Sequence, residues 1–302
     1  MPTQAELISR VQAILRDSSV AAATVLGYLN EGQGAIAGGL KLPEGMMSNP
    51  LPELLVNTAL TSSITLPYIS LPTAAGSAYQ RLLHMLISST QDSEISLLTS
   101  WKDYVRRDVK LDDTGSIDRA IVRGKRLYYG PIPSSAESLV AHYYRKPVDM
   151  ATLTGTGISF TAATKTIADT GSGLGVFVGG IGQQIDITGS TSNNGTYTVS
   201  TAAAGSVVVE ETLVDEAAAA TVVIKSRSDG IPEHLQYALL VNYACKEIFR
   251  WLESQLNTKN PRGDVHIGLF VDAMVSLHDY CPDPPGEVLT IGDDFEYIED
   301  GE

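Results

Sequence analysis

The most regular pattern of hydrophobic and polar positions lies between Ile231 and Asn257. Apolar residues recur there at spacings of three, four and seven, which places one hydrophobic stripe along a helix of about six to seven turns. Pro232 suits the first helical turn, and Pro261 follows the expected end. The stripe predicts packing against other helices through Leu235, Leu239, Cys245, Ile248, Phe249 and Leu252.

Helical spacing also marks both ends of the chain. Thr3 and Glu6 have the spacing of a capping box, and a first helix is expected to run from there to about Asp17. A second helical pattern follows it and fades at Gly38, and another covers Asp264–Tyr280. We expect these terminal helices to pack together as one α bundle from which the β segments project.

The middle of the chain changes to strand patterns. Between Pro50 and Pro147 short alternating runs are separated by turn residues, and Arg119–Arg145 is expected to form a three-stranded meander. Residues 151–225 are rich in Thr, Gly, Ser, Ala and Val, with a hairpin signal at Asn193-Asn194-Gly195. This composition predicts a small β domain inserted into its host.

The predicted fold class is therefore α+β. It has a helical-bundle core from the N- and C-terminal helices, a β-rich middle segment and an inserted small antiparallel β domain. The predicted domains are a host core at 1–150 (N-terminal helices plus β meander), a β-sandwich-like insertion at 151–225, and the rest of the host core at 226–302 (C-terminal helices plus acidic tail).

Charge is unevenly distributed along the chain. The formal net charge is −14, and Pro282–Glu302 contains eight acidic residues and no basic one. An acidic chain argues against a dedicated nucleic-acid clamp, but not against a protein that surrounds DNA. Apolar residues among the tail's acids are typical of a segment that orders on a partner, so we expect a partner interface at Phe295, Tyr297 and Ile298.

Candidate chemistry is sparse. Asp-Thr-Gly-Ser occurs at 113–116 and at 169–172, as in pepsin-like proteases, but the two copies are too close for a two-lobed enzyme and have ordinary turn composition. Gly171–Gly175 lacks the spacing of a phosphate loop, and the five histidines form no ligand pair. We predict no catalytic, cofactor-binding or metal-binding residue. The basic stretch around Lys102 and Arg106, next to Trp101, is expected to be a solvated face, with phosphate contact as the alternative.

A family resemblance rests on several diffuse motifs. They are Arg10–Asp17, Tyr28–Gln33 with Ile36-Ala37, Leu71-Pro72, Tyr128–Pro133, Tyr143–Pro147, and Ile231–Leu239 continuing to Phe249–Leu252. In this order they resemble the head-to-tail adaptor (connector) proteins of tailed bacteriophages. Ile185–Gly189 and Asn193–Val199 are similar to small β modules of phage structural proteins.

The resemblance implies a structural virion protein without enzymatic activity. Such a protein forms a dodecameric ring on the portal, extends the DNA channel and receives nozzle or tail-tube proteins, while DNA passes without specific recognition. It implies no cofactor, no membrane partner, and a place in the head-tail neck after assembly in the host cytoplasm. The alternatives are a receptor-binding or capsid-decorating phage protein that uses the inserted β domain and, third, an aspartic protease.

Overall fold

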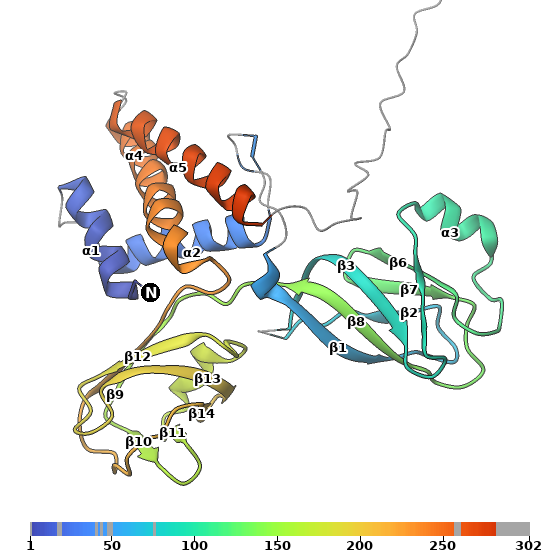
Figure 1. The fold of residues 1–302 in the computed structure, drawn as a ribbon, viewed down its shortest axis with the longest axis horizontal. Helices are drawn as coiled ribbons and strands as arrows, with labels where there is room; N and C mark the ends of the chain where they lie inside the picture. Colours follow the sequence, from blue (N-terminus) through green and yellow to red (C-terminus); the bar gives the residue numbers. More distant parts are fainter. Residues whose placement is uncertain are drawn as a thin grey trace, which may run out of the picture.

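The computed structural model describes residues 2–16, 20–39, 42, 45–46, 51–74, 77–256 and 261–281. Figure 1 shows three lobes arranged around a central meeting point. The helical lobe contains residues 2–39 and 231–281, the two-sheet lobe residues 51–145, and the seven-strand lobe residues 151–226.

The helical lobe combines helices from the two ends of the chain. Thr3 begins the first helix with the predicted capping box, in which Thr3 Oγ1 accepts the N–H of Glu6 and Glu6 Oε2 accepts the N–H of Thr3. Gly32 allows the second and fourth helices to approach closely, because a Cβ at this position would lie 2.7 Å from the Tyr243 ring. The helices are α1 (Gln4–Leu15), α2 (Ala22–Ala37), α4 (Asn242–Leu256) and α5 (Pro261–Tyr280).

The stretch predicted as one helix over Ile231–Asn257 is irregular at its start. A 3₁₀ turn (Glu233–Leu235) and a π turn (Tyr237–Val241) precede α4. Asn242 N–H bonds to the carbonyl of Leu239, and its side-chain Nδ2 donates to the carbonyl of Ala238 at 2.7 Å. The Asn242 side chain therefore occupies a carbonyl that a regular α-helix would pair with the Asn242 N–H.

The two-sheet lobe packs two four-stranded sheets around one hydrophobic cluster that includes Leu86, Leu127, Tyr129 and Tyr143. The first sheet has the order β1-β8-β3-β4, with β1 (Leu55–Thr61), β3 (Tyr79–Ser88), β4 (Ser93–Glu94) and β8 (Ser138–Arg145). The second has the order β2-β7-β6-β5, with β2 (Tyr68–Ser70), β5 (Ser96–Leu97), β6 (Arg119–Arg123) and β7 (Arg126–Gly130). The short helix α3 (Trp101–Arg107) lies between β5 and β6 in sequence.

The predicted meander over Arg119–Arg145 is only half present. β6 and β7 form an antiparallel hairpin whose turn uses Gly124 at φ +62°. β8 instead joins the other sheet, between β1 and β3. From there its buried residues Leu139, Ala141 and Tyr143 pack onto the hairpin's Leu127 and Tyr129, so the third strand faces the hairpin across the core.

The seven-strand lobe is one antiparallel sheet with the order β10-β11-β14-β13-β12-β15-β9. A 3₁₀ turn (Gly173–Phe177) contributes Leu174 and Phe177 to its hydrophobic cluster. The strands are β9 (Thr152–Gly155), β10 (Ile158–Thr161), β11 (Thr166–Asp169), β12 (Gln184–Thr188), β13 (Gly195–Ala203), β14 (Ser206–Val209) and β15 (Val222–Ser226).

The prediction of a helical-bundle core for the α+β fold is wrong. Within the described ranges five α-helices accompany fifteen strands, and two of the three hydrophobic clusters are built by sheets. Each strand lobe buries its own apolar residues, so the sheets do not depend on a helical core. The overall mixture is α+β, with β structure predominating.

Candidate assembly surface and the junction that positions it

A buried ion pair lies where the three lobes meet. Arg145, the last residue of β8, donates to both carboxylate oxygens of Asp229 at 2.7 and 3.0 Å. Both side chains are less than one-tenth exposed, and Asp229 also accepts the N–H of Val148 at 2.7 Å. Removing one partner would leave an uncompensated buried charge, which costs about 3–5 kcal/mol.

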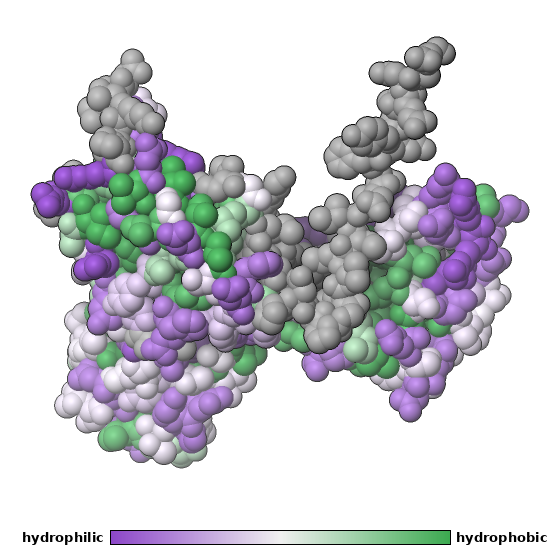
Figure 2. Space-filling view, turned by 45° about the horizontal axis from the view of Figure 1, so that its top comes forward, coloured by the Kyte–Doolittle hydropathy of each residue, from purple (hydrophilic) through white to green (hydrophobic). Residues whose placement is uncertain are grey.

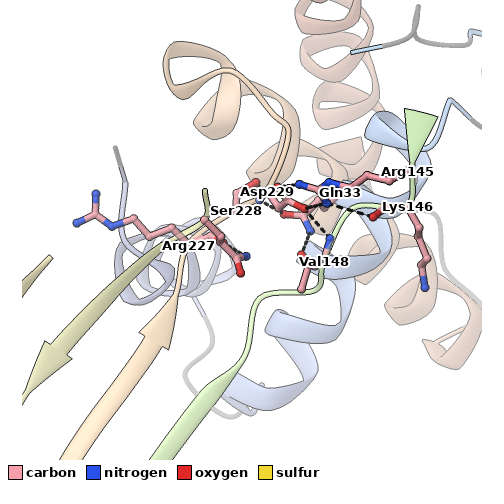
Figure 3. A network of polar contacts seen from close by, with 8 residues as sticks. Gln33, Arg145, Lys146, Val148, Arg227, Ser228 and Asp229 are labelled. Carbon is pink, nitrogen blue, oxygen red and sulfur yellow. Dashed lines mark hydrogen bonds and ion pairs between the residues drawn. The ribbon is translucent and has the colours of Figure 1, made fainter. Parts of the chain in front are cut away.

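Gln33 of α2 connects this pair to the helical lobe (Figure 3). Its Nε2 donates to the carbonyl of Val148 at 2.7 Å, and its Oε1 accepts from Ser228 Oγ and the Asp229 N–H, each at 2.8 Å. The side chain of Arg227 points away from this network, onto Asp186 of the seven-strand lobe. These bonds fix the segments 146–151 and 227–231 side by side. The two segments connect the three lobes.

Sequence reasoning did not find this junction, because Gln33 and Asp229 are separated by 196 positions. A signal does exist. Gln33 lies four residues after Leu29 and three before Ile36, so it interrupts the apolar stripe of the second predicted helix. A fully buried glutamine needs polar partners, and here the connecting segments supply them.

A groove of about 960 Å³ opens on the helical lobe between α1, the π turn and α5. Asn242 lines it and links two elements, since its Nδ2 donates to Ala238 and its Oδ1 lies 2.8 Å from His266 Nδ1. Apolar contact area comes mainly from Ile14, Ala238, Val241 and Leu269, together with the ring of Tyr237. The irregular start of the predicted helix therefore shapes part of the groove wall.

Few charges face this groove. Arg10 and Glu6 line its α1 side. The N–H and hydroxyl of Thr3 lower the pKa of Glu6, so this carboxylate stays ionised and caps α1. Burial lowers the pKa of His266, which keeps its imidazole neutral at pH 7. The arrangement suits the burial of an apolar segment of another protein surface better than the binding of an ion.

The helical lobe also exposes large hydrophobic side chains beside and beyond the groove. Six of the thirteen exposed large hydrophobic residues in the described ranges lie between positions 237 and 280: Tyr237, Trp251, Val265, Leu269, Val275 and Tyr280. Figure 2 shows hydrophobic residues gathered on this lobe. Such a concentration marks an interaction surface. The sequence signal was that Asp264–Tyr280 carries more apolar residues than one buried stripe needs.

The sequence-predicted packing residues come together in the helical lobe. Leu235, Leu239, Cys245, Ile248 and Phe249 are buried in its hydrophobic cluster, and Leu252 is partly buried against it. Phe249 also stacks on the His266 ring at 5.7 Å. The predicted partner-interface residues Phe295, Tyr297 and Ile298 lie outside the described residues.

The two Asp-Thr-Gly-Ser copies are on different lobes (Figure 1). Asp169 ends β11, and its carboxylate accepts the N–H groups of Gly171 and Gly173 at 3.0 and 2.6 Å, as in a tight turn. Asp113 lies in the two-sheet lobe with Asp108 and Asp112, where three carboxylates come within 4.8 Å. Asp108 accepts the N–H groups of Leu111 and Asp113, so it too is turned toward the backbone.

Comparison with known families gives one informative match. The sequence pattern of the SU10 adaptor protein family matches residues 2–163, more than half of the chain. The matched range covers α1, α2, the two-sheet lobe and the first strands of the seven-strand lobe, and it ends before the segment at Ile231–Leu252. A comparison with curated proteins gave no match.

In the described residues every helix is too short or too polar to span a bilayer. The family match agrees with the resemblance found in the sequence, and the exposed apolar face of the helical lobe suits a protein that contacts other virion components. This chain belongs to the SU10 adaptor protein family and is a bacteriophage head-tail adaptor, a structural protein of the virion.

Proposed function

We propose that this chain assembles into a ring, with twelve copies as the family resemblance implies, that joins the portal to the tail and extends the DNA channel. The ring would lie in the head-tail neck of the virion, after assembly in the host cytoplasm. Its other partners would be nozzle or tail-tube proteins. The observation that carries the proposal is the groove with its surrounding exposed hydrophobic residues on the helical lobe.

Ring formation requires two complementary faces on one chain, because each copy contacts a neighbour on either side. The groove provides a concave face, and the exposed residues Val265 and Val275 of α5 provide apolar area outside it. Burial of apolar area stabilises association by about 25 cal/mol per Å² before the entropy of association is subtracted. We therefore place the subunit contact on the helical lobe.

The proposed role requires no catalysis. Viral DNA would pass through the ring without specific recognition, and the net charge of −14 supports this because an acidic lumen repels phosphates.

We also propose that the chain divides into domains at 1–150, 151–225 and 226–302. The separate hydrophobic cluster of the seven-strand lobe supports this division.

The portal contact is proposed to include Phe295, Tyr297 and Ile298 of the acidic tail. Each tail would lose conformational entropy on ordering, so each contact is weak and the ring gains affinity by multivalency. Deletion of residues 286–302 should reduce co-sedimentation with portal rings. Undiminished binding would contradict this contact.

Ring formation is tested by a paired substitution in the groove. Tyr237 and Leu269 both line it and are 44% and 47% exposed, so Tyr237→Ser with Leu269→Ser should leave the fold intact and weaken assembly. The matched control is Val176→Ser with Val214→Ser, at 48% and 54% exposure on the seven-strand lobe. Native mass spectrometry and negative-stain images, with and without portal, measure the oligomer.

We expect the wild type and the control to form rings, alone or on the portal, and the groove variant to remain monomeric. A wild type that stays monomeric on the portal would contradict the proposed ring. Equal assembly of the groove variant and the control would exclude the groove as the subunit contact.

A further inference from the structure

A cluster of aromatic and basic side chains lies on the outer face of the β2-β7-β6-β5 sheet, beneath α3. Trp101 of α3 packs edge-on against Tyr128 of β7 with ring centroids 5.0 Å apart, and Tyr128 pairs with Tyr68 across the β2–β7 ladder. Arg123 lies over the Trp101 ring at 4.7 Å, and Arg126 lies over the Tyr68 ring at 4.4 Å. We call Tyr68, Trp101, Arg123, Arg126 and Tyr128 the basic-aromatic surface.

The two arginines of this surface form an unusual pair. Arg123 and Arg126 lie directly opposite each other in the β6–β7 hairpin, and both are exposed. Like charges opposite each other destabilise a strand pair. Each guanidinium group lies over its own ring, and neither makes a hydrogen bond or ion pair with any of the described residues. Two preorganised guanidinium groups therefore present unpaired N–H donors to an anionic ligand.

We propose that the basic-aromatic surface binds the acidic C-terminal tail of its own chain, residues 282–302, in the free protein. Charge complementarity supports this occupant, because the tail has eight acidic residues and no basic one, whereas the β6–β7 hairpin exposes the basic residues Arg123, Lys125 and Arg126. Phe295 and Tyr297 would pack on the exposed edges of the aromatic cluster, with neighbouring carboxylates on the two arginines.

The end of α5, from which the tail continues in sequence, contacts this lobe. Tyr280 Oη donates to Glu53 Oε1 at 3.2 Å, and Glu53 lies just before β1, at the base of the two-sheet lobe. Phe295 follows Cys281 by fourteen residues, which can extend over roughly 46–50 Å. The ten-residue strand β3 is only about 33 Å long. The tail is therefore long enough to reach the basic-aromatic surface along the lobe.

Tethering favours the tail over free nucleic acid as the ligand. A segment on the same chain has a high effective concentration, whereas duplex DNA must approach a chain with a net charge of −14. This contact would form in the protein before it meets a portal, and it does not require a ring.

The test uses Trp101 as a reporter in the full chain. The sequence has two tryptophans, so Trp251→Phe leaves only Trp101. Acrylamide quenching of Trp101 fluorescence is measured at low salt in four proteins. They are the Trp251→Phe protein itself, the same protein with the tail substitutions Phe295→Ser and Tyr297→Ser, the same protein with Arg126→Gln, and the protein that carries all of these substitutions. Arg126 stacks on Tyr68 and not on Trp101, so its removal does not uncover the reporter directly. Arg16→Gln, an exposed arginine of the helical lobe, is the matched control.

We expect the tail substitutions and Arg126→Gln each to increase quenching of Trp101. Their combination should give no further increase. High salt should also increase quenching of Trp101 in the protein with an unaltered tail. Arg126→Gln should weaken the tail contact about tenfold, as expected for the loss of a charge-assisted hydrogen bond. Arg16→Gln should change nothing. Far-UV circular dichroism checks that every variant is folded.

The proposal is overturned if the tail substitutions leave quenching of Trp101 unchanged. Protection that disappears on dilution would assign the contact to the tail of another copy and overturn the intramolecular arrangement. Protection given by added duplex DNA, with no effect of the tail substitutions, would assign the surface to nucleic acid instead. Portal co-sedimentation of the same variants reports separately on the proposed function.

Discussion

The helical lobe and the seven-strand lobe use their hydrophobic residues differently. The seven-strand lobe comes from one continuous segment and buries its apolar side chains in alternating strand positions, with Val176, Ile181 and Val214 exposed outside the strands. The helical lobe comes from both ends of the chain, exposes six large hydrophobic residues and has a groove of about 960 Å³. The first has the surface of an independent domain. The second exposes an apolar surface of the kind that contacts a partner.

The largest expected effects are those of removing one buried ring from each lobe. Phe249→Ala in the helical lobe and Phe177→Ala in the seven-strand lobe should each lower the free energy of unfolding by about 3–5 kcal/mol. If the lobes unfold independently, each substitution shifts only its own transition in calorimetry. An unchanged denaturation midpoint for Phe249→Ala would mean that its ring does not support the monomer. A shift of both transitions by either substitution would show that the two cores unfold together.

Asp229→Asn should have the next largest effect, because it leaves Arg145 without a charged partner in a buried site. We expect a loss of about 3 kcal/mol, at the lower end for a broken buried pair since asparagine retains an acceptor for the Val148 N–H. The substitution loosens the connection between lobes, so limited proteolysis should cut near 146–151 and 227–231 first. Asp186→Asn, whose partner Arg227 also contacts Gln184 and Thr196, is the comparison. Equal cleavage of both variants would contradict a special role for the junction.

The difference between these regions also explains what sequence could predict. The hairpin of β12 and β13 and the helical stripe through Ile248 and Phe249 depend on neighbours in sequence, and local pattern identified both, although Gly195 begins β13 and the connection covers residues 189–194. Arg145 and Asp229 depend on partners far along the chain, and no periodicity specifies such partners. The route of β8 into the opposite sheet is of the same kind, because the same alternating pattern fits either sheet. The groove could not be predicted, because sequence periodicity does not show which apolar residues of α5 other elements leave uncovered.

The two lobes should also respond to acid at different pH. Burial lowers the pKa of His266 below its usual 6.5, so the unfolded chain takes up a proton more readily than the folded one. The contribution of neutral His266 to the stability of the helical lobe is therefore complete above pH 6.5 and decreases as the pH falls below that value. In the seven-strand lobe, hydrogen bonds from the Ser190 hydroxyl and the Thr191 N–H lower the pKa of Glu216 from 4.5 to about 2. Its stabilising contribution is complete above pH 4.5 and is lost between there and about pH 2.

Calorimetry as a function of pH measures this difference. The helical transition should move first on acidification, and His266→Gln should flatten its dependence between pH 7 and pH 5 without affecting the other transition. Glu216→Gln should flatten the dependence of the seven-strand lobe below pH 4.5. A helical transition that is independent of pH until both lobes lose stability together would contradict the assignment to His266.

The smallest expected effect on the helical lobe comes from the largest change, the replacement of residues 151–225 by a short Gly/Ser linker. Ser226 N–H donates to the carbonyl of Ala151 at 3.0 Å, so the ends of the segment are adjacent and a short linker closes the gap. The bonds of Asn30 to Met150 and of Gln33 to Ser228 lie outside the replaced segment and remain. The helical lobe loses the bond from Thr152 Oγ1 to Gln4 Oε1, whose net value is about 1 kcal/mol.

Gln4→Ala in the full chain removes the same bond and gives the matched comparison. We expect cooperative melting with helical circular dichroism retained in both variants. Loss of the helical signal on replacement alone would show that the seven-strand lobe completes the core of the helical lobe and is not an independent unit.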